Sequence, residues 1–429
     1  MIGRKLLMTA GACVLSLAVA RAEQAPQTAS PPRGPAASLA ALEQQALSRH
    51  PAIREAEARL EEARGRATQA GAWMNPTVGI TMDELRPREN PSGFVGAFVQ
   101  QTIPLGGKLA VAATAAELEV VRREAALSAV RQRVISTIRT RFYAMLTAEE
   151  RVTVTERLAA NADEVIEIAR QLFNVGMADQ PDVLTAEVGA RRVALDLVNA
   201  RTTAEASWRL LAVAVAEPAL PRGSPGPLDT ALPDLDRDAS LARVLRDNPD
   251  LATAMREVER ERAAVTVAGR IMRPDLFLRG EAGWNREHLT SSPVRPIGWQ
   301  FGLEAGFSLP AFNKNSGAIT AAGAAVTAAE SAVANLRLTL EGRFAVEFAD
   351  YERARAAVQA YRADILPRAE QAHALYLEKY RQMAAAYPQV LAAQRVLIDL
   401  TGEYIEALDR AWRAALRLQG LLVERGMWE

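Results

Sequence analysis

The chain has 429 residues, of which 51 are basic and 51 are acidic. This balance excludes the common kind of nucleic-acid-binding protein, because such proteins carry a marked excess of lysine and arginine. Aromatic residues make up only 5% of the chain, and Ala, Leu, Arg and Glu dominate, as in long helices and coiled coils.

Residues 1–22 have the features of a secretory signal peptide. A basic start precedes an apolar segment that ends in the cleavage pattern Ala20-Arg21-Ala22. The single cysteine, Cys13, lies inside this segment. Lipid attachment to Cys13 is the alternative, but Ala10 stands where a lipoprotein needs leucine, so we expect ordinary cleavage. No later segment is an uninterrupted apolar run of about 18 residues, so we expect no transmembrane helix after it.

The chain after the signal peptide divides into two similar halves. A Pro-rich leader, 23–37, precedes the first half, 38–216, and a Pro-rich linker, 217–237, separates it from the second half, 238–429. Four landmarks recur in the same order, which indicates an internal duplication. The matched landmarks are His50-Pro51 and Asn248-Pro249, Pro76 and Pro274, Pro104 and Pro310, and 173–181 and 380–388.

Each half predicts a helix, two extended segments, a very long helix, a turn and another helix. At about 1.5 Å per residue the longest helices would reach roughly 100 Å, so they must pack against neighbours along their whole length. Apolar residues at spacings of three, four and seven favour coiled-coil packing. On the helices alone, a plain coiled-coil rod is an alternative. The expected helices are 36–73, 106–173, 182–215, 239–272, 316–380 and 389–425.

The extended segments alternate between apolar and polar residues, which is the pattern of strands with two different faces. They cover 76–83, 94–103, and the stretches from Leu276 to Asn285 and from Phe301 to Leu309. The better ones have the length of a tilted strand that crosses a bilayer. Ordinary amphipathic hairpins packed on the helices are the alternative interpretation.

A membrane barrel would place the apolar face outward and the charged residues Arg279, Glu281 and Glu304 in the lumen. Four strands cannot close a barrel, and an open edge cannot stand in lipid, so several chains would have to share it. The segments 85–93 and 286–297 would be the outward loops.

These features together resemble the TolC-like outer-membrane efflux channels over about 39–426. The resemblance rests on the duplication, the His50-Pro51 and Asn248-Pro249 helix starts, and the FNVG…DVLTA stretch that begins at Phe173. The segments QTIPLGGK (101–108) and SLPAFNKNSG (308–317) look most like the branch that serves heavy-metal efflux pumps, the CzcC-like proteins.

The resemblance implies a mainly α fold with a membrane β-barrel portion. It implies a homotrimer, in which three chains form a twelve-stranded barrel in outer-membrane lipid and an α-helical tunnel through the periplasm. The implied partners are a periplasmic adaptor protein and a proton-driven inner-membrane pump of the resistance-nodulation-division class. The expected location is therefore the cell outer membrane, with a periplasmic tunnel.

The expected function is a passive exit duct, for heavy-metal cations in the first place and for organic toxins or type I secreted proteins as the alternative. A periplasmic adaptor or structural rod is an alternative of a different class, but the repetition of both strands and helical hairpins speaks against it. No nucleophile triad, phosphate loop or CxxC motif is present, so we expect no enzyme and no cofactor. His50, His288 and His373 are too scattered for a zinc site, and we expect them to be surface or capping residues.

The two helix turns correspond to the family's periplasmic tips. In the first tip, Asn174, Val175, Gly176 and Met177 match the adaptor-docking turn, followed by Asp179 and Asp182. The second tip departs from the pattern, because Met383 stands where glycine is usual and Gln389 where some members have an acid. Closure of the tunnel would then fall to Asp179, Asp182 or the ring of Tyr387. The alternative is that the two aspartates simply cap the following helix.

Overall fold

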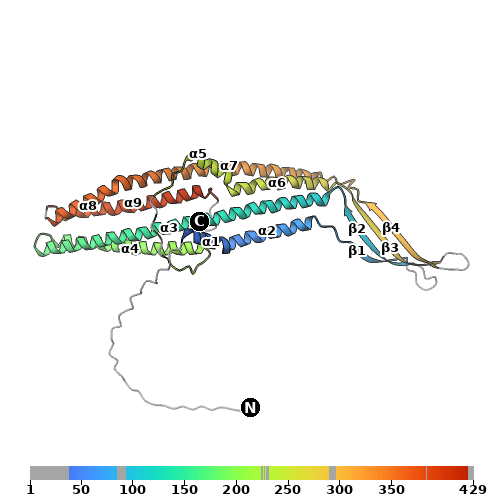
Figure 1. The fold of residues 1–429 in the computed structure, drawn as a ribbon, viewed down its shortest axis with the longest axis horizontal. Helices are drawn as coiled ribbons and strands as arrows, with labels where there is room; N and C mark the ends of the chain where they lie inside the picture. Colours follow the sequence, from blue (N-terminus) through green and yellow to red (C-terminus); the bar gives the residue numbers. More distant parts are fainter. Residues whose placement is uncertain are drawn as a thin grey trace, which may run out of the picture.

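The structure is a computed structural model that describes residues 38–84, 93–223, 226, 228, 231–288, 296–382 and 384–423. The expected signal peptide, 1–22, and the leader, 23–37, lie outside the described residues. Most of the expected loops 85–93 and 286–297 lies outside them as well. The molecule is a long rod of helices with a small sheet at one end (Figure 1).

The two halves of the chain follow the same order of elements. The first half contains α1 (Leu39–Arg49), α2 (Pro51–Ala70), β1 (Thr77–Asp83), β2 (Phe94–Pro104), α3 (Lys108–Asn174) and α4 (Gln180–Ala214). The second half contains α5 (Arg237–Asp247), α6 (Pro249–Arg270), β3 (Asp275–His288), β4 (Pro296–Phe307), α7 (Ser316–Ala360), a π-helical turn η1 (Tyr361–Ile365), α8 (Leu366–Arg381) and α9 (Tyr387–Gln419).

The first helix of each half is broken, whereas the sequence analysis expected one continuous helix over 36–73 and another over 239–272. The break falls at His50 and at Asn248, which have extended backbone angles (ψ 127° and 120°) and each precede a proline. A proline ring disfavours helical geometry in the residue before it, and proline itself is well suited to the first position of the next helix. Both residues then cap that helix: His50 Nδ1 accepts from the Ala52 amide, and Asn248 Oδ1 from the Leu251 amide.

The second long helix, expected as one piece over 316–380, contains the π-helical turn η1 just before Pro367. Proline cannot donate the backbone hydrogen bond of a regular helix, and a π-turn is one way for the chain to accommodate it. The last helix ends at Gln419 instead of 425, because Leu421 and Leu422 take positive φ angles of 64° and 52°.

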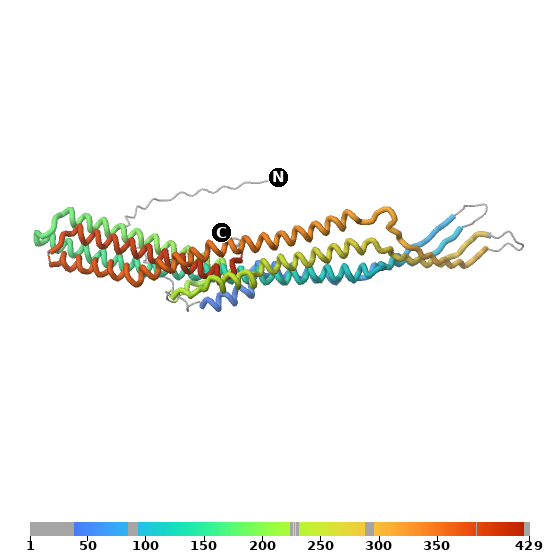
Figure 2. Tube along the Cα trace, turned by 90° about the horizontal axis from the view of Figure 1, so that it is seen from above, coloured from blue at the N-terminus to red at the C-terminus, as the bar shows by residue number. Residues whose placement is uncertain are grey.

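The helices form two neighbouring groups. α3 packs against α4 in one group and α7 and α8 pack against α9 in the other, while α2 and α6 run beside the half of α3 nearer the sheet (Figure 2). α3 has 67 residues and is therefore about 100 Å long, as expected. Among the described residues, one helical stretch, Ser316–Arg381, is long and apolar enough to cross a membrane by length and composition only, and it is rich in alanine.

The largest apolar core lies where the helix groups meet in the middle of the rod. Trp208 and Leu211 of α4 are buried there with Leu408 and Trp412 of α9. The ring of Tyr143 on α3 stacks on Trp412 with 4.2 Å between ring centroids. This core joins the two halves of the chain where the short helices α1 and α5 lie against the rod (Figure 1).

Nearer the sheet, α3 and α6 are joined by charges. Arg122 binds Glu119 on its own helix at 2.7 Å and Glu257 on α6 at 3.1 Å. Arg260 reaches both of these carboxylates from α6. The hydrogen bond from Arg122 lowers the pKa of Glu119 to about 2, so this network stays charged over the whole physiological pH range.

Asn248 has a second role that His50 lacks. Its side-chain amide donates to the carbonyl of Leu421 at 2.7 Å, and the side chain is only 1% exposed. It therefore ties the start of α6 to the end of the described chain, and its removal would leave a buried carbonyl without this donor.

We predict that Asn248→Ala lowers the free energy of unfolding by about 1–3 kcal/mol, because it removes a helix cap and leaves a buried acceptor unpaired. Thermal unfolding of the purified protein in detergent, followed by circular dichroism, measures this. His50→Ala is the matched control and should cost less, because His50 only caps. Equal effects of the two substitutions would contradict the importance of the Leu421 contact.

Candidate functional sites: the sheet faces and the helix tips

The four strands form one antiparallel sheet in the order β1-β2-β3-β4. The register pairs Val78 with Val99, Ala97 with Ala282, and Trp284 with Trp299. Every apolar face predicted from the single strands therefore falls on the same side of the sheet. Both halves of the chain contribute to this one sheet, because β2 of the first half pairs with β3 of the second.

The apolar face of the sheet is open to the surroundings of the chain. Leu303 is 85% exposed, Phe301 77% and Ile80 70%. Trp284 and Trp299 meet edge to face at 6.1 Å towards one end of the strands. A contiguous exposed apolar surface with aromatic side chains near a strand end is the arrangement of a sheet that faces lipid.

The opposite face carries the three charged residues expected in a barrel lumen. Arg279 lies beside Glu304 in the register, and Glu281 follows two residues later on β3. Arg279 Nη2 donates to Thr81 Oγ1 at 2.9 Å and to Glu281 Oε2 at 3.3 Å. Its guanidinium lies 4.2 Å from the centre of the Phe98 ring. The placement of these residues could be predicted from alternation, but these cross-strand contacts could not.

The first helix tip is a glycine-terminated helix end. The amide of Gly176 donates to the Phe173 carbonyl at 2.9 Å, and the amide of Met177 to the Leu172 carbonyl at 2.8 Å. Gly176 has a φ of 75°, so the positive angle expected for this turn is present. Asn174, Val175 and Met177 are exposed around it, and a side chain added at Gly176 would meet no atom within 4 Å.

The two aspartates of the first tip are at the start of α4. Asp179 occupies the position before the helix, but its side chain makes no capping hydrogen bond. Asp182 lies in the first turn, where a carboxylate is favoured by the helix dipole. Capping in the strict sense therefore does not account for Asp179, which remains exposed.

The second tip is held together by two tyrosines. Tyr380 and Tyr387 are 4% and 3% exposed, with ring centroids 5.7 Å apart, in a small core with Val165, Ala169 and Val390. Burial raises the pKa of Tyr387 to about 12. The ring of Tyr387 is packed inside the tip of its own chain, and its role in closing a tunnel stays a prediction. Gln389 is exposed, and Met383 lies outside the described residues.

Ion pairs connect the helices near the tips. Arg381 of α8 contacts Glu164 of α3, and Arg170 of α3 binds Glu187 of α4 at 2.7 Å. His373 lies in the same region of α8 and is buried, contrary to the expectation of a surface or capping histidine. His50 does cap a helix, while His288 is the last residue of β3 instead of a loop residue.

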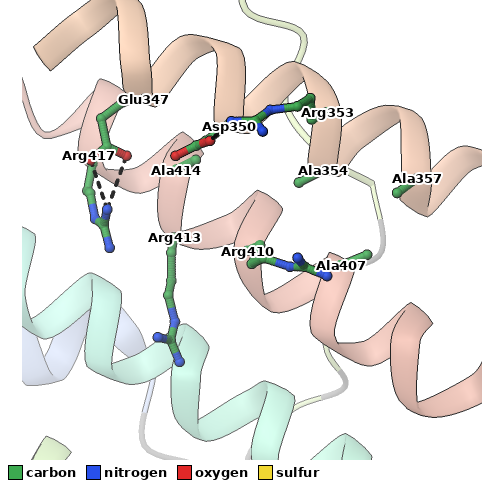
Figure 3. Close-up of a pocket in the computed structure, with 10 residues that line it drawn as sticks. All are labelled: Glu347, Asp350, Arg353, Ala354, Ala357, Ala407, Arg410, Arg413, Ala414 and Arg417. Atoms are coloured by element: carbon green, nitrogen blue, oxygen red, sulfur yellow. Dashed lines mark hydrogen bonds and ion pairs between the residues drawn. The ribbon is translucent and has the colours of Figure 1, made fainter. Parts of the chain in front are cut away.

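A groove of about 390 Å³ lies between α7 and α9, and its charged side chains are shown in Figure 3. Arg417 holds both carboxylate oxygens of Glu347 at 2.8 and 3.1 Å, and Arg353 contacts Asp350. These pairs join side chains of the groove to each other. Within the described part of the chain, no group of three or more His, Cys, Asp or Glu residues could hold a metal ion.

The chain matches the family described as outer membrane efflux protein over residues 42–217 and 241–423. The protein belongs to this family. The family is one of channels and not of enzymes, which confirms the interpretation of the sequence, and it rules out the adaptor and the plain rod. The chain is an outer-membrane efflux channel with a periplasmic extension.

Individual known proteins resemble this chain in sequence or in fold. The cobalt-zinc-cadmium resistance protein CzcC of Cupriavidus metallidurans is 26% identical over 367 residues, which cover 85% of this chain and 84% of CzcC. The outer membrane protein VceC of Vibrio cholerae has a TM-score of 0.72 and 21% identity, covering 89% of this chain and 95% of VceC. The MtrE channel of Neisseria gonorrhoeae in its open state has a TM-score of 0.69 and 20% identity, covering 91% of each chain. The expected fold class, mainly helical with four strands per chain, is confirmed.

The buried histidine of the tip predicts a pH dependence. Burial lowers the pKa of His373 below its ordinary value of 6.5, although the nearby Glu164 carboxylate opposes this. The neutral form is thus favoured in the folded state. The contribution of neutral His373 to stability is therefore complete above pH 6.5. It is lost as the pH falls from 6.5 through the lowered pKa of His373.

We therefore predict that acidification below pH 6.5 loosens the helix tips. His373→Leu should remove part of this sensitivity to acid. Hydrogen exchange of the amides around Leu172 and Tyr387, measured above and below that pH, reports the loosening. His50→Asn is the control. Burial also lowers the pKa of His50, but this residue lies far from the tips. Identical acid sensitivity of wild type and His373→Leu at the tips would contradict the prediction.

Proposed function

We propose that this channel is the passive exit duct of a tripartite exporter of heavy-metal cations. The support for the cargo is the similarity to a relative described as a cobalt-zinc-cadmium resistance protein, together with the QTIPLGGK and SLPAFNKNSG segments at the ends of the hairpins. In this proposal a proton-driven inner-membrane pump of the resistance-nodulation-division class selects and drives the cargo, and a periplasmic adaptor connects the pump to this chain.

The proposed channel is a homotrimer. The sheet has two free edges, β1 and β4, and an apolar face that suits lipid. Backbone groups at a free edge cannot be left without hydrogen bonds in the hydrocarbon core of a membrane. A second copy can cover each edge, and three copies of four strands give a closed ring of twelve. Arg279, Glu281 and Glu304 would then line its water-filled interior.

We assign adaptor docking to the first tip, formed by Asn174, Val175, Gly176 and Met177 with Asp179 and Asp182. The exposed apolar side chains of Val175 and Met177 flank a glycine that leaves open space above the backbone. This surface suits the close approach of a partner helix. The second tip, with Met383, Tyr387 and Gln389, has no described glycine, and its aromatic ring is buried. We therefore propose that the second tip holds the helices together and does not itself bind the adaptor.

The described residues offer no metal-binding cluster, and this suits a wide duct in which ions pass without tight binding. Exposed carboxylates such as Asp179 would provide a weak, water-filled filter for cations. Organic toxins or type I secreted proteins remain the alternative cargo, because the same tube would serve them and the pump would choose.

We predict that Gly176→Trp abolishes export while the protein still reaches the outer membrane as a trimer. Tryptophan fills the open space over the turn and is strained at a φ of 75°. Export in living cells and trimer content in membrane fractions are the two measurements. Gly176→Asn is the matched control, because asparagine tolerates this backbone angle with little bulk. Full export by Gly176→Trp would show that the adaptor docks elsewhere.

A strain without this chain should become more sensitive to zinc, cobalt and cadmium and should accumulate them, whereas its tolerance of dyes should not change. The reason is that the pump loses its outlet to the medium. Growth inhibition and cellular metal content measure this. Sensitivity to dyes alone would contradict the metal cargo and favour the alternative. The same strain carrying the wild-type chain on a plasmid is the control.

A further inference from the structure

One row of residues crosses all four strands on the polar face of the sheet. Gly79 of β1 pairs with Phe98 of β2, Phe98 with Glu281 of β3, and Glu281 with Gly302 of β4. The row begins and ends with glycine, while the two residues between carry long side chains. This arrangement gives both side chains free backbone to lie on.

The Phe98 ring lies against Gly79. A Cβ atom added to Gly79 would come within 2.6 Å of Phe98 Cε1, which real side chains do not allow. In the same way, a Cβ on Gly302 would come within 2.8 Å of Glu281 Cγ. Gly79 lies within a regular strand, so its requirement is for space and not for an unusual backbone angle.

The other phenylalanines of the polar face repeat this arrangement. Phe94 lies over Gly96 and Gly283, and Phe277 lies over Gly306. All three phenylalanines on this face, from Thr77 to Phe307, therefore meet glycine. Aromatic rings that would otherwise stand upright on the sheet are laid against it.

Arg279 forms a third layer on Gly79 and Phe98. Its guanidinium lies over the ring at 4.2 Å and donates across β2 to Thr81 on β1 at 2.9 Å, with Glu281 at 3.3 Å as its counter-charge. Both a cation–π contact and a charge-assisted hydrogen bond thus hold this side chain down. Among the register-paired residues of the sheet it is the one lysine or arginine, because Arg286 of β3 lies between the last regular pair and His288. The acidic residues in the same register are Asp83, Asp275, Glu281 and Glu304.

We propose that the Gly79–Phe98–Arg279 stack sets the bore and the charge selectivity of the barrel. This inference rests on the proposed function, because it requires several copies to close the sheet around water. Glycine lets the ring lie on the wall, and the ring holds the guanidinium on the wall beside Glu281. Passing cations then meet a wide lumen whose unpaired charge is that of carboxylates such as Glu304. Arg279 is a positioned, neutralised cation and not a barrier.

The test is single-channel recording of the full-length protein in planar lipid bilayers. Gly79→Val lifts the Phe98 ring and releases Arg279 into the lumen. We expect roughly twofold lower conductance and a reversal potential shifted away from cation preference, as follows for a charged constriction. Adding Phe98→Ala to Gly79→Val should restore most of the conductance, because the displaced ring is gone. It should not restore the cation preference, because the ring that holds Arg279 on the wall is gone as well.

The matched control is Gly280→Val. Gly280 lies on the apolar face of β3, where an added Cβ meets no atom within 4 Å, so conductance and selectivity should equal those of wild type. Gly79→Ala is measured in parallel. Its methyl group alone meets the Phe98 ring, so this smaller variant tests the stack if Gly79→Val does not assemble.

The outcomes separate this inference from the proposed function. If Gly79→Val and Gly79→Ala both assemble and both conduct as the wild type does, the stack has no role in the bore. The proposed duct would be unaffected by that result. Absence of any conductance from the wild type would contradict the duct and this inference together. An equal loss in Gly280→Val would also overturn the stack, because the effect would then come from strand distortion on either face.

Discussion

Backbone groups in lipid must be hydrogen bonded, and the architecture of this chain follows from that requirement. The sheet satisfies it internally at three strand pairs but leaves an edge on β1 and another on β4. Those edges make the chain incomplete by itself in a membrane. The same applies to the helices: α3 is about 100 Å long and cannot be stable without neighbours along its length. The exposed apolar residues of the sheet follow from this.

Because of the duplication, one chain supplies four hydrogen-bonded strands and two helical hairpins from two similar halves. Each half supplies one hairpin to the sheet and one helical hairpin to the rod, and the two sheet hairpins join through β2 and β3. The halves are not equivalent in detail. Asn248 caps and also ties the end of the chain, while His50 only caps. The first tip ends in an open glycine turn, while the second buries Tyr387 in a core. Such asymmetry allows one tip to specialise in contacts with a partner and the other in holding the helices together.

Much of this could be predicted from local pattern. Alternation placed Arg279, Glu281 and Glu304 on one face, and the glycine of FNVG predicted the turn at Gly176. Three of the errors share a cause. The breaks at His50 and Asn248 and the π-turn before Pro367 arise because proline acts on the residues before it, which the apolar period does not reveal. The burial of His373 and Tyr387 depends on the helices packed against them. The stack of Arg279 on Phe98 and Gly79 depends on which strand lies beside which and in what register.

Spacing in the sequence was sufficient to predict which residues share a face, which segments are helices or strands, and that the chain repeats itself. These follow from the fixed geometry of helix and strand, so they can be read from spacing alone. Which faces meet became apparent only from the packing of the folded chain. Residues 79, 98 and 279 come from three strands and two halves of the chain, and they touch because the register of β1, β2 and β3 brings them together. Cross-strand register is a choice among many pairings of similar local energy, and the packing of the whole chain makes it.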